Sequence, residues 1–245
     1  MTGNKFAGQI CVYCCVQPST SDDHVFARKF FLEANRSNLL QVPACDSCNG
    51  AKGELESELM LILPFGGRHT DASENLARLG AARIAKNKRV ARLLTRQKHH
   101  IWLREAGLLR RGISVPLDWE RVANLFAYIT RALAWHHFQV RLGPECFVET
   151  HPLVGPIGQT LRRLQRLNAK ERVEKDVGGG TFHYWGAQGT DNPQITAWEF
   201  SVYGGIRSEH SGDNPTNIGA VTGPVRTLNR ALLVSRWRRG TRLHD

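Results

Sequence analysis

Two CxxC pairs constrain this chain more than any other feature of its sequence. Cys11 and Cys14 form the first pair, Cys45 and Cys48 form the second, and residues 15–44 lie between them. Two such pairs can supply four thiolates to one tetrahedral zinc ion, which leaves no open coordination position for a substrate. We therefore expect a structural Zn²⁺ that closes this loop and holds its contents against the second pair.

Three other interpretations of the cysteines compete with a metal site: a disulfide framework, two unrelated pairs, and a redox dithiol. Five of the six cysteines lie near the N-terminus, at Cys11, Cys14, Cys15, Cys45 and Cys48, so they are not spread as in a disulfide framework. No βαβ pattern surrounds either pair, as it would in a thioredoxin-like dithiol. Cys15 is expected either to compete for the metal or to pack.

The charge balance favours a polyanionic partner. The chain has 33 Lys and Arg against 22 Asp and Glu, a formal net charge of +11 and a pI near 9.8, which is typical of proteins that bind nucleic acid. It has no run of about 18 apolar residues, and its first residues, MTGNKFAGQI, lack the apolar core of a signal peptide. We expect a soluble, cytoplasmic protein with no membrane partner.

Nearly all of the excess charge lies in one segment. Residues 78–111 contain eleven Lys and Arg and a single acid. Apolar residues between Ser73 and about Arg104 recur at helical spacing, so this segment is predicted to be helical. Without acids to pair with, its cations repel one another unless a partner offsets them, although a solvated helix face is the alternative. The residues expected to bind nucleic-acid phosphates here are Arg83, Lys86, Arg89, Arg92 and Arg96.

Other elements follow from local patterns. Strands are predicted at 21–26 and 39–43, followed by a helix that Asp46 caps and Pro64 ends. A further helix is predicted from Asp118, its N-cap, because apolar residues follow at helical spacing. The expected fold class is α+β.

The C-terminal part is expected to combine a helix at Gly158–Lys170, an antiparallel pair formed by TFHYWGA and ITAWEFSVYGGI, and a basic tail from Thr222. The chain would then divide into a zinc-stapled module at 1–64 and, at 65–245, a mainly helical basic region with a small antiparallel β element. Several histidines and aromatic residues are interpreted as core residues: His136, His137, Trp185, Trp198 and Tyr203.

The stretch SDDHVFARKFF lies inside the loop that the cysteines close. Hydrolysis of a phosphodiester needs a base for the water and a cation for the charge on phosphate. His24 can be the base, although a structural histidine is the alternative, and Asp23 is a hard oxygen donor suited to Mg²⁺. After the second pair, Asn49 offers an amide oxygen to the same ion and Lys52 can reach a phosphate. Asp22 is interpreted as a solvated neighbour.

Four motifs in order, CxxC, DHV, NLLQVPAC and CxxCNxxK, resemble the HNH endonuclease superfamily of the zinc-stapled ββα-metal kind over residues 10–60. The resemblance implies that His24 is the general base and that Asp23 and Asn49 bind one Mg²⁺ or Mn²⁺. It also implies that Asn38 orients the base, although Asn38 could equally cap or turn the chain.

Two departures from the family concern the loop after His24. Arg28, a candidate for binding nucleic acid, lies where a Pro or Lys is often found, and Phe26 and Ala27 replace the customary prolines. The segments RALAWHHF, TFHYWGA and ITAWEFSVYGGI resemble the C-terminal half of a group of bacterial HNH proteins.

The function expected from these features is hydrolysis of DNA, with double-stranded DNA as the favoured partner. By resemblance, the products would carry a 5′ phosphate and a 3′ hydroxyl. The alternative is a non-catalytic, zinc-dependent nucleic-acid-binding module, which would keep the four cysteines without needing Asp23, His24 and Asn49 together. RNA as the substrate, nicking against double-strand cleavage, and a homodimer against a separate targeting protein all stay open.

Overall fold

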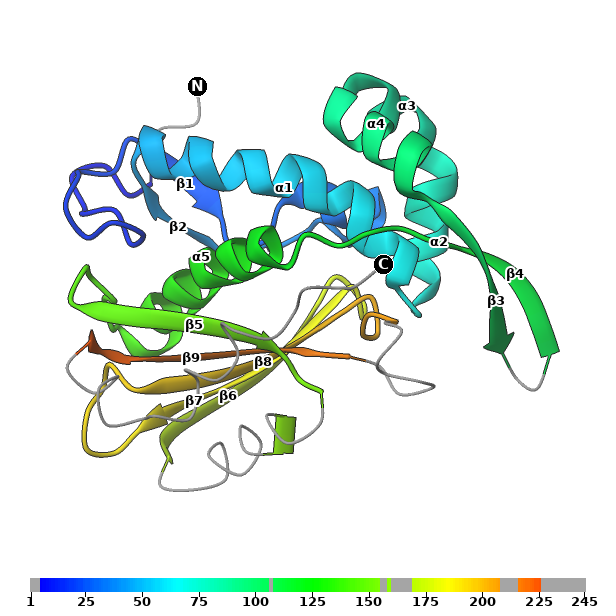
Figure 1. The fold of residues 1–245 in the computed structure, drawn as a ribbon. Coiled ribbons are helices and arrows are strands. Elements are labelled where there is room, and N and C mark those ends of the chain that lie inside the picture. The colour runs from blue at the N-terminus through cyan, green and yellow to red at the C-terminus, as the bar shows by residue number, and fades with distance from the viewer. Residues whose placement is uncertain (1–4, 106–107, 155–157, 160–168, 208–215, 226–245) are drawn as a thin grey trace.

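Figure 1 presents the chain as a computed structural model, which describes residues 5–105, 108–154, 158–159, 169–207 and 216–225. The architecture is α+β, as the sequence predicts, and every sheet is antiparallel. Among the described residues, no helix is long and apolar enough to cross a membrane.

A short hairpin and a long helix form the N-terminal part. β1 (Ser21–His24) pairs with β2 (Gln41–Ala44), and α1 (Asp46–Gly66) begins two residues later. These elements lie close to their predicted positions, and α1 continues to Gly66, just past Pro64, where it was predicted to end.

The predicted cap of α1 is wrong. Cys45, whose side chain makes no capping bond, occupies the N-cap position, and the Asp46 carboxylate instead accepts a 2.6 Å hydrogen bond from the Thr20 hydroxyl. The helix therefore begins beside a residue of the four-cysteine cluster and not at an acidic cap.

Short helices follow along the basic segment: α2 (Thr70–Asn75), the π-helical turn Leu76–Gly80, α3 (Ala81–Lys86) and α4 (Lys88–Gln97). The chain then forms a hairpin of β3 (His99–Glu105) and β4 (Leu108–Ser114), where a helix was predicted to continue to Arg104. The prediction fails there because leucine and arginine favour helices in isolation, while strand pairing, which depends on residues beyond Arg104, decides the structure.

The helix predicted from Asp118 is confirmed as α5 (Trp119–Phe138). The Asp118 carboxylate accepts a 3.3 Å hydrogen bond from the backbone N–H of Arg121, and Gln139 ends the helix in a left-handed conformation. The side chains facing inward are almost fully buried, as the periodicity predicts.

The C-terminal β element is larger than predicted. Five strands form one sheet in the order β5-β9-β8-β7-β6. The strands are β5 (Cys146–Pro152), β6 (Ala169–Val177), β7 (Phe182–Gly189), β8 (Thr196–Val202) and β9 (Ile218–Pro224). The predicted pairing of TFHYWGA with ITAWEFSVYGGI is confirmed as β7 with β8.

Two C-terminal predictions concern residues that lie largely outside the described part of the chain. The helix expected at Gly158–Lys170 covers 160–168, which lie outside the described residues, and Lys170 itself belongs to β6. The basic tail begins within β9, and its arginines at 226–245 also lie outside the described part of the chain.

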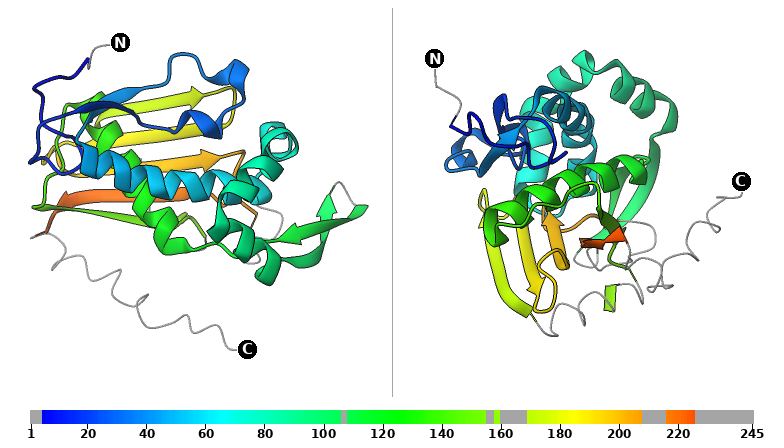
Figure 2. Two further views of the ribbon diagram at one scale, coloured as in Figure 1. Left: turned by 90° about the horizontal axis from the view of Figure 1, so that it is seen from above. Right: turned by 90° about the vertical axis from the view of Figure 1, so that its left-hand side faces the viewer.

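The molecule is layered, as Figures 1 and 2 show. α5 lies between the five-stranded sheet and α1, and the β1–β2 hairpin lies beside α1. One hydrophobic core runs through all of these layers, from Val12 to Ala220. The division at residue 64 stays a prediction.

Aromatic residues join the loop after β1 to the sheet. The ring of Phe26 lies 4.7 Å from that of Phe182, and the rings of Phe30 and Phe31 lie 5.3 and 5.6 Å from it. The sequence FARKFF, in which prolines are customary in the resembled family, therefore packs the N-terminal loop onto β7.

Candidate functional site

The four expected cysteines form a cluster that can hold a metal. The Sγ atoms of Cys11, Cys14, Cys45 and Cys48 lie within 4.8 Å of one another, and those of Cys14 and Cys45 are 3.9 Å apart. Four thiolates around one zinc ion, with Zn–S bonds of about 2.3 Å, lie roughly 3.8 Å apart, so the donor set fits zinc.

Backbone groups support this cluster. The N–H groups of Tyr13 and Gln17 each donate a 3.4 Å hydrogen bond, to Cys11 Sγ and Cys14 Sγ respectively. Cys15 lies outside the cluster: it adopts a left-handed backbone conformation with φ of 57°, and its thiol donates to the backbone oxygen of Val12. Of its two expected roles, packing is the one observed.

Asp23 lies in a buried ion cluster next to the cysteines. It is 7% exposed, and its Oδ2 accepts a 2.5 Å hydrogen bond from the Tyr13 hydroxyl and lies 3.0 Å from Lys52 Nζ. Burial and the charge of Asp23 raise the pKa of Tyr13 well above its ordinary value, so this hydroxyl stays a donor.

Lys52 is fully buried, which corrects its expected role as a phosphate contact. Its ammonium group binds Asp23 Oδ2, Glu56 Oε1 and the backbone oxygen of His24, which uses all three of its protons. Burial raises the pKa of Glu56, and the Lys52 charge partly offsets this effect. Two carboxylates and one ammonium leave this cluster with one formal negative charge.

His24 is half-buried and has one unsatisfied nitrogen. Burial lowers the pKa of its imidazole, Arg28 and Lys52 lower it further, and Asp23 acts in the opposite direction. The imidazole is therefore neutral near pH 7. Its Nδ1 is buried without a hydrogen-bond partner among the described residues, which is the state of an atom that takes a water or an ion as its partner.

Asn49 lies on the first turn of α1, near β1. Its Nδ2 donates a 2.9 Å hydrogen bond to Ser21 Oγ, so the amide oxygen is left without a partner among the described residues. Asp23 Oδ1 likewise accepts no hydrogen bond there, since both contacts of this carboxylate go to Oδ2. Two oxygens of the kind that Mg²⁺ or Mn²⁺ prefers therefore keep free lone pairs.

The structure brings together only part of the predicted site. Asp23, the backbone of His24 and Lys52 are in direct contact. Asn49 reaches β1 through Ser21 and shares no hydrogen bond with Asp23 within the described part of the chain. A cluster of three or more His, Cys, Asp or Glu ligands is found among the described residues only at the four cysteines.

Asn38 does not contact the base, which corrects the role implied by resemblance. It is exposed, has a φ of 57° and makes no side-chain hydrogen bond to His24 among the described residues. It forms a turn, the alternative expected for an asparagine, because asparagine tolerates the left-handed conformation. Asp22 is also more than a solvated neighbour, because its carboxylate accepts hydrogen bonds from the backbone N–H groups of Lys5 and Phe6.

The cations predicted to bind phosphates fall into two groups, and the first is engaged within the protein. Arg83 donates to the backbone oxygen of Lys29 at 3.1 Å and to the Asn75 side chain at 3.2 Å. Arg89 Nε lies 3.0 Å from the buried carboxylate of Glu58. Both guanidinium groups therefore already have partners within the protein, and their expected role as phosphate contacts stays a prediction.

The second group is exposed: Arg28, Lys86, Arg92 and Arg96. None of these four side chains makes an ion pair with another described residue. Their role as nucleic-acid contacts stays a prediction.

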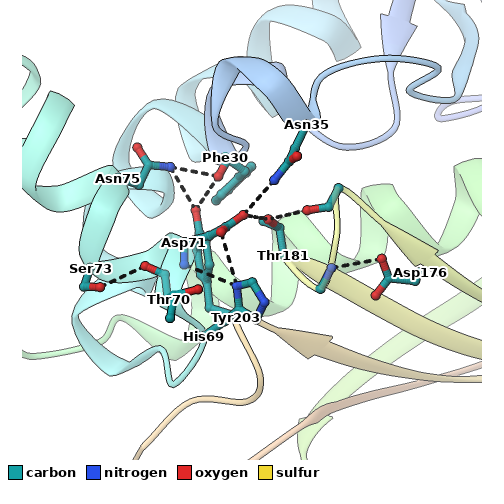
Figure 3. Close-up of polar contacts among 12 residues, drawn as sticks. Phe30, Asn35, His69, Thr70, Asp71, Ser73, Asn75, Asp176, Thr181 and Tyr203 are labelled. Atoms are coloured by element: carbon teal, nitrogen blue, oxygen red, sulfur yellow. Dashed lines mark hydrogen bonds and ion pairs between the residues drawn. The ribbon is translucent and has the colours of Figure 1, made fainter.

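A second buried carboxylate, Asp71, belongs to a separate network of hydrogen bonds. Figure 3 shows that Asn35 and Thr181 donate to its Oδ2, at 3.0 and 2.9 Å, from the loop after β1 and from the turn before β7. In the same cluster, the Tyr203 hydroxyl donates to the backbone oxygen of Phe30 at 2.6 Å. The network connects three parts of the fold, so we interpret its role as structural.

Two residues of the ion cluster were missed at the level of sequence. Glu56 follows Lys52 by four residues, a spacing typical of helical ion pairs that could have identified it. Tyr13 lies between the first two cysteines in CVYCC, and no local pattern marks its hydroxyl as a partner of Asp23.

Comparison of the chain with protein-family models, with curated proteins and with solved structures finds no match.

Proposed function

We propose that this chain is a metal-dependent endonuclease of the HNH type that hydrolyses phosphodiester bonds in DNA. One observation carries the proposal: His24 Nδ1 is buried without a hydrogen-bond partner among the described residues, and Asp23 Oδ1 and Asn49 Oδ1 accept no hydrogen bond from a described residue. Buried polar atoms without partners are rare in folded proteins and call for a ligand or water.

Each part of the N-terminal unit has a role in this proposal. A zinc ion held by the four cysteines fixes the start of α1 against the loop that contains β1. Asp23 and Asn49 would hold one Mg²⁺ or Mn²⁺, which supplies positive charge for the scissile phosphate and the departing 3′ oxygen. The net negative charge of the Asp23, Lys52 and Glu56 cluster favours a cation at this position.

His24 would act as the general base. Its imidazole is neutral near pH 7 because burial and neighbouring cations lower its pKa, so it can take a proton from the attacking water. Arg28, exposed nearby, would contact the substrate phosphate.

The test is cleavage of supercoiled plasmid by the zinc-loaded full chain with Mg²⁺ or Mn²⁺. Replacement of His24 by alanine should lower the cleavage rate by about 100 to 10,000-fold and leave DNA binding nearly unchanged. His183→Ala is the matched control, since His183 lies on β7 with its side chain 44% exposed. Equal cleavage by the parent and His24→Ala would refute the mechanism.

One observation favours the second candidate, a zinc-dependent nucleic-acid-binding module without hydrolysis. The Lys52 ammonium already neutralises Asp23 at 3.0 Å, and a divalent ion would have to bind beside this charge. Binding of Mn²⁺ to the zinc-loaded protein, followed by electron paramagnetic resonance, separates the two candidates. Binding that is lost in Asp23→Asn supports the nuclease, whereas its absence in the parent supports the binding module.

A further inference from the structure

The β3–β4 hairpin exposes much more apolar surface than its size requires. Trp102 is 66% exposed, Leu108 70%, Leu109 69% and Ile113 40%, and these are half of the eight large hydrophobic residues that are exposed in the described structure. In Figures 1 and 2 the hairpin extends away from the helices and the five-stranded sheet. Apolar surface gathered on a projecting element marks an interaction site.

The strand register places aromatic and cationic side chains on one face. Trp102 lies opposite Arg111, and His100 lies opposite Ile113, so these four side chains share one face of the hairpin. The Arg111 guanidinium lies over the Trp102 indole, 5.9 Å from the ring centroid. This contact pre-orders an arginine on an exposed aromatic ring.

The segment that precedes β3 along the chain adds further cations. Arg92, Arg96 and Lys98 are exposed and make no ion pair with other described residues. Unpaired like charges repel one another, so this surface is complementary to a polyanion. A second copy of the hairpin would bring like charges together, and a purely apolar partner would leave them without counter-charges.

We propose that the β3–β4 hairpin is a DNA-binding ribbon that enters a groove of the duplex, while the α4 cations bind the flanking phosphates. The major groove, about 12 Å wide, admits a two-stranded β-ribbon. The proposal deepens the proposed function, on which it rests, by naming the element that holds the duplex.

The position of α4 relative to the candidate site suits a single duplex. α4 packs on the C-terminal half of α1, where Val90 forms a small core with Leu61 and Ile62. Lys52 and Leu61 are nine residues apart on α1, about 14 Å along the helix axis at 1.5 Å per residue. A duplex rises that far in about four base pairs.

The test is fluorescence anisotropy of a labelled 25-base-pair duplex with the zinc-loaded His24→Ala chain and no added divalent ion, so that binding is measured without cleavage. Trp102→Ala and Arg111→Gln should each weaken binding by about 10-fold. Arg92→Gln with Arg96→Gln should weaken binding for all sequences and reduce the salt slope by about two, one for each lost phosphate contact.

The controls match these changes on other surfaces. Ile195→Ala removes an apolar residue that is 42% exposed, and Lys170→Gln removes an exposed cation of β6. Both should bind the duplex like the parent. Circular dichroism and sedimentation of every variant check its folding and its oligomeric state.

Three results would overturn the proposal. The first is binding by Trp102→Ala and Arg111→Gln equal to that of the parent. The second is tighter binding of single strands than of duplex with loss only of the former in Trp102→Ala, which would make the ribbon a base-stacking platform. The third is dissociation of a dimer in Trp102→Ala with unchanged DNA affinity. If the parent chain cleaves no plasmid with Mg²⁺ or Mn²⁺ while the binding results are as expected, the ribbon is supported and only the nuclease is refuted.

Discussion

The two halves of α1 carry buried ion clusters of opposite composition. Near its start, Lys52 is fully buried between the carboxylates of Asp23 and Glu56. Six residues later, Glu58 is 2% exposed, and its Oε2 lies 3.0 Å from Arg89 Nε and 3.0 Å from Arg121 Nε.

The two clusters differ in net charge and in burial. A buried charge needs partners because its desolvation is unfavourable, but one partner would suffice in each case. The cluster next to the cysteines has a formal charge of −1, whereas the cluster next to α4 is formally neutral, because Arg89 also lies 3.5 Å from Asp118 Oδ2. Only the first cluster has a net charge that suits a bound cation, and the two lie about 9 Å apart along one helix.

The largest effect should come from loss of the metal site that positions the first cluster. Cys48→Ala should abolish zinc binding and unfold β1 and β2, because structural zinc contributes about 10 kcal/mol or more to such modules. Hydrogen exchange should show loss of protection in both strands and retained protection in α5. Cys146→Ala, the same change at a buried cysteine outside the cluster, is the control. Unchanged protection of β1 would show that the packed aromatic residues, and not zinc, stabilise the N-terminal strands.

The next largest effect compares the two central charges directly. Lys52→Met leaves two carboxylates without their counter-ion and should lower the free energy of unfolding by about 3–5 kcal/mol. Glu58→Gln should lower it by about 1 kcal/mol, because the side chains of Arg89 and Arg121 are 59% and 24% exposed and water solvates them.

Urea unfolding measures both changes, with Lys170→Met as the exposed lysine control. Equal losses in the two variants would mean that the clusters are equally solvated and that their difference in burial has no energetic consequence. A neutral Lys52→Met would argue that Asp23 and Glu56 share a proton in the folded protein.

The cysteine cluster and α5 could be predicted from sequence because each depends on a local rule. Ligand spacing defines the first, and the Asp118 cap with apolar periodicity defines the second. The burial of Lys52 could not be predicted, since it depends on β1 and α1 coming together. An exposed lysine at the same helical position would have the same sequence pattern.

The missed strands have different physical causes. β6 has the sequence AKERVEKDV, and only every fourth side chain of this edge strand is even partly buried, so it lacks a two-residue alternation. β9, IGAVTGP, contains two glycines, which are uncommon in strands. Its sequence therefore did not predict a strand between β5 and β8. The β3–β4 hairpin is rich in leucine and arginine, which favour helices.

The smallest effect concerns a half-buried titratable group with no counter-ion, which serves as a reference for both clusters. His137 on α5 forms a 2.8 Å hydrogen bond with the Tyr184 hydroxyl, and burial, His136 and Lys175 lower its pKa to about 4. The protein thus keeps this group neutral, whereas it pairs Lys52 and Glu58 with opposite charges.

Because the folded pKa of His137 lies below the unfolded value of 6.5, the unfolded chain binds its proton first as the pH falls. The stabilisation is therefore complete above pH 6.5 and is lost between pH 6.5 and about 4. The loss should be about 1–2 kcal/mol after solvent screening. Thermal unfolding across this range should show a fall in Tm that His137→Gln reduces, while His183→Gln, at an exposed histidine, retains it. An identical pH dependence in the parent and His137→Gln would place the titrating group elsewhere, and the two ion clusters of α1 would be the first positions to test.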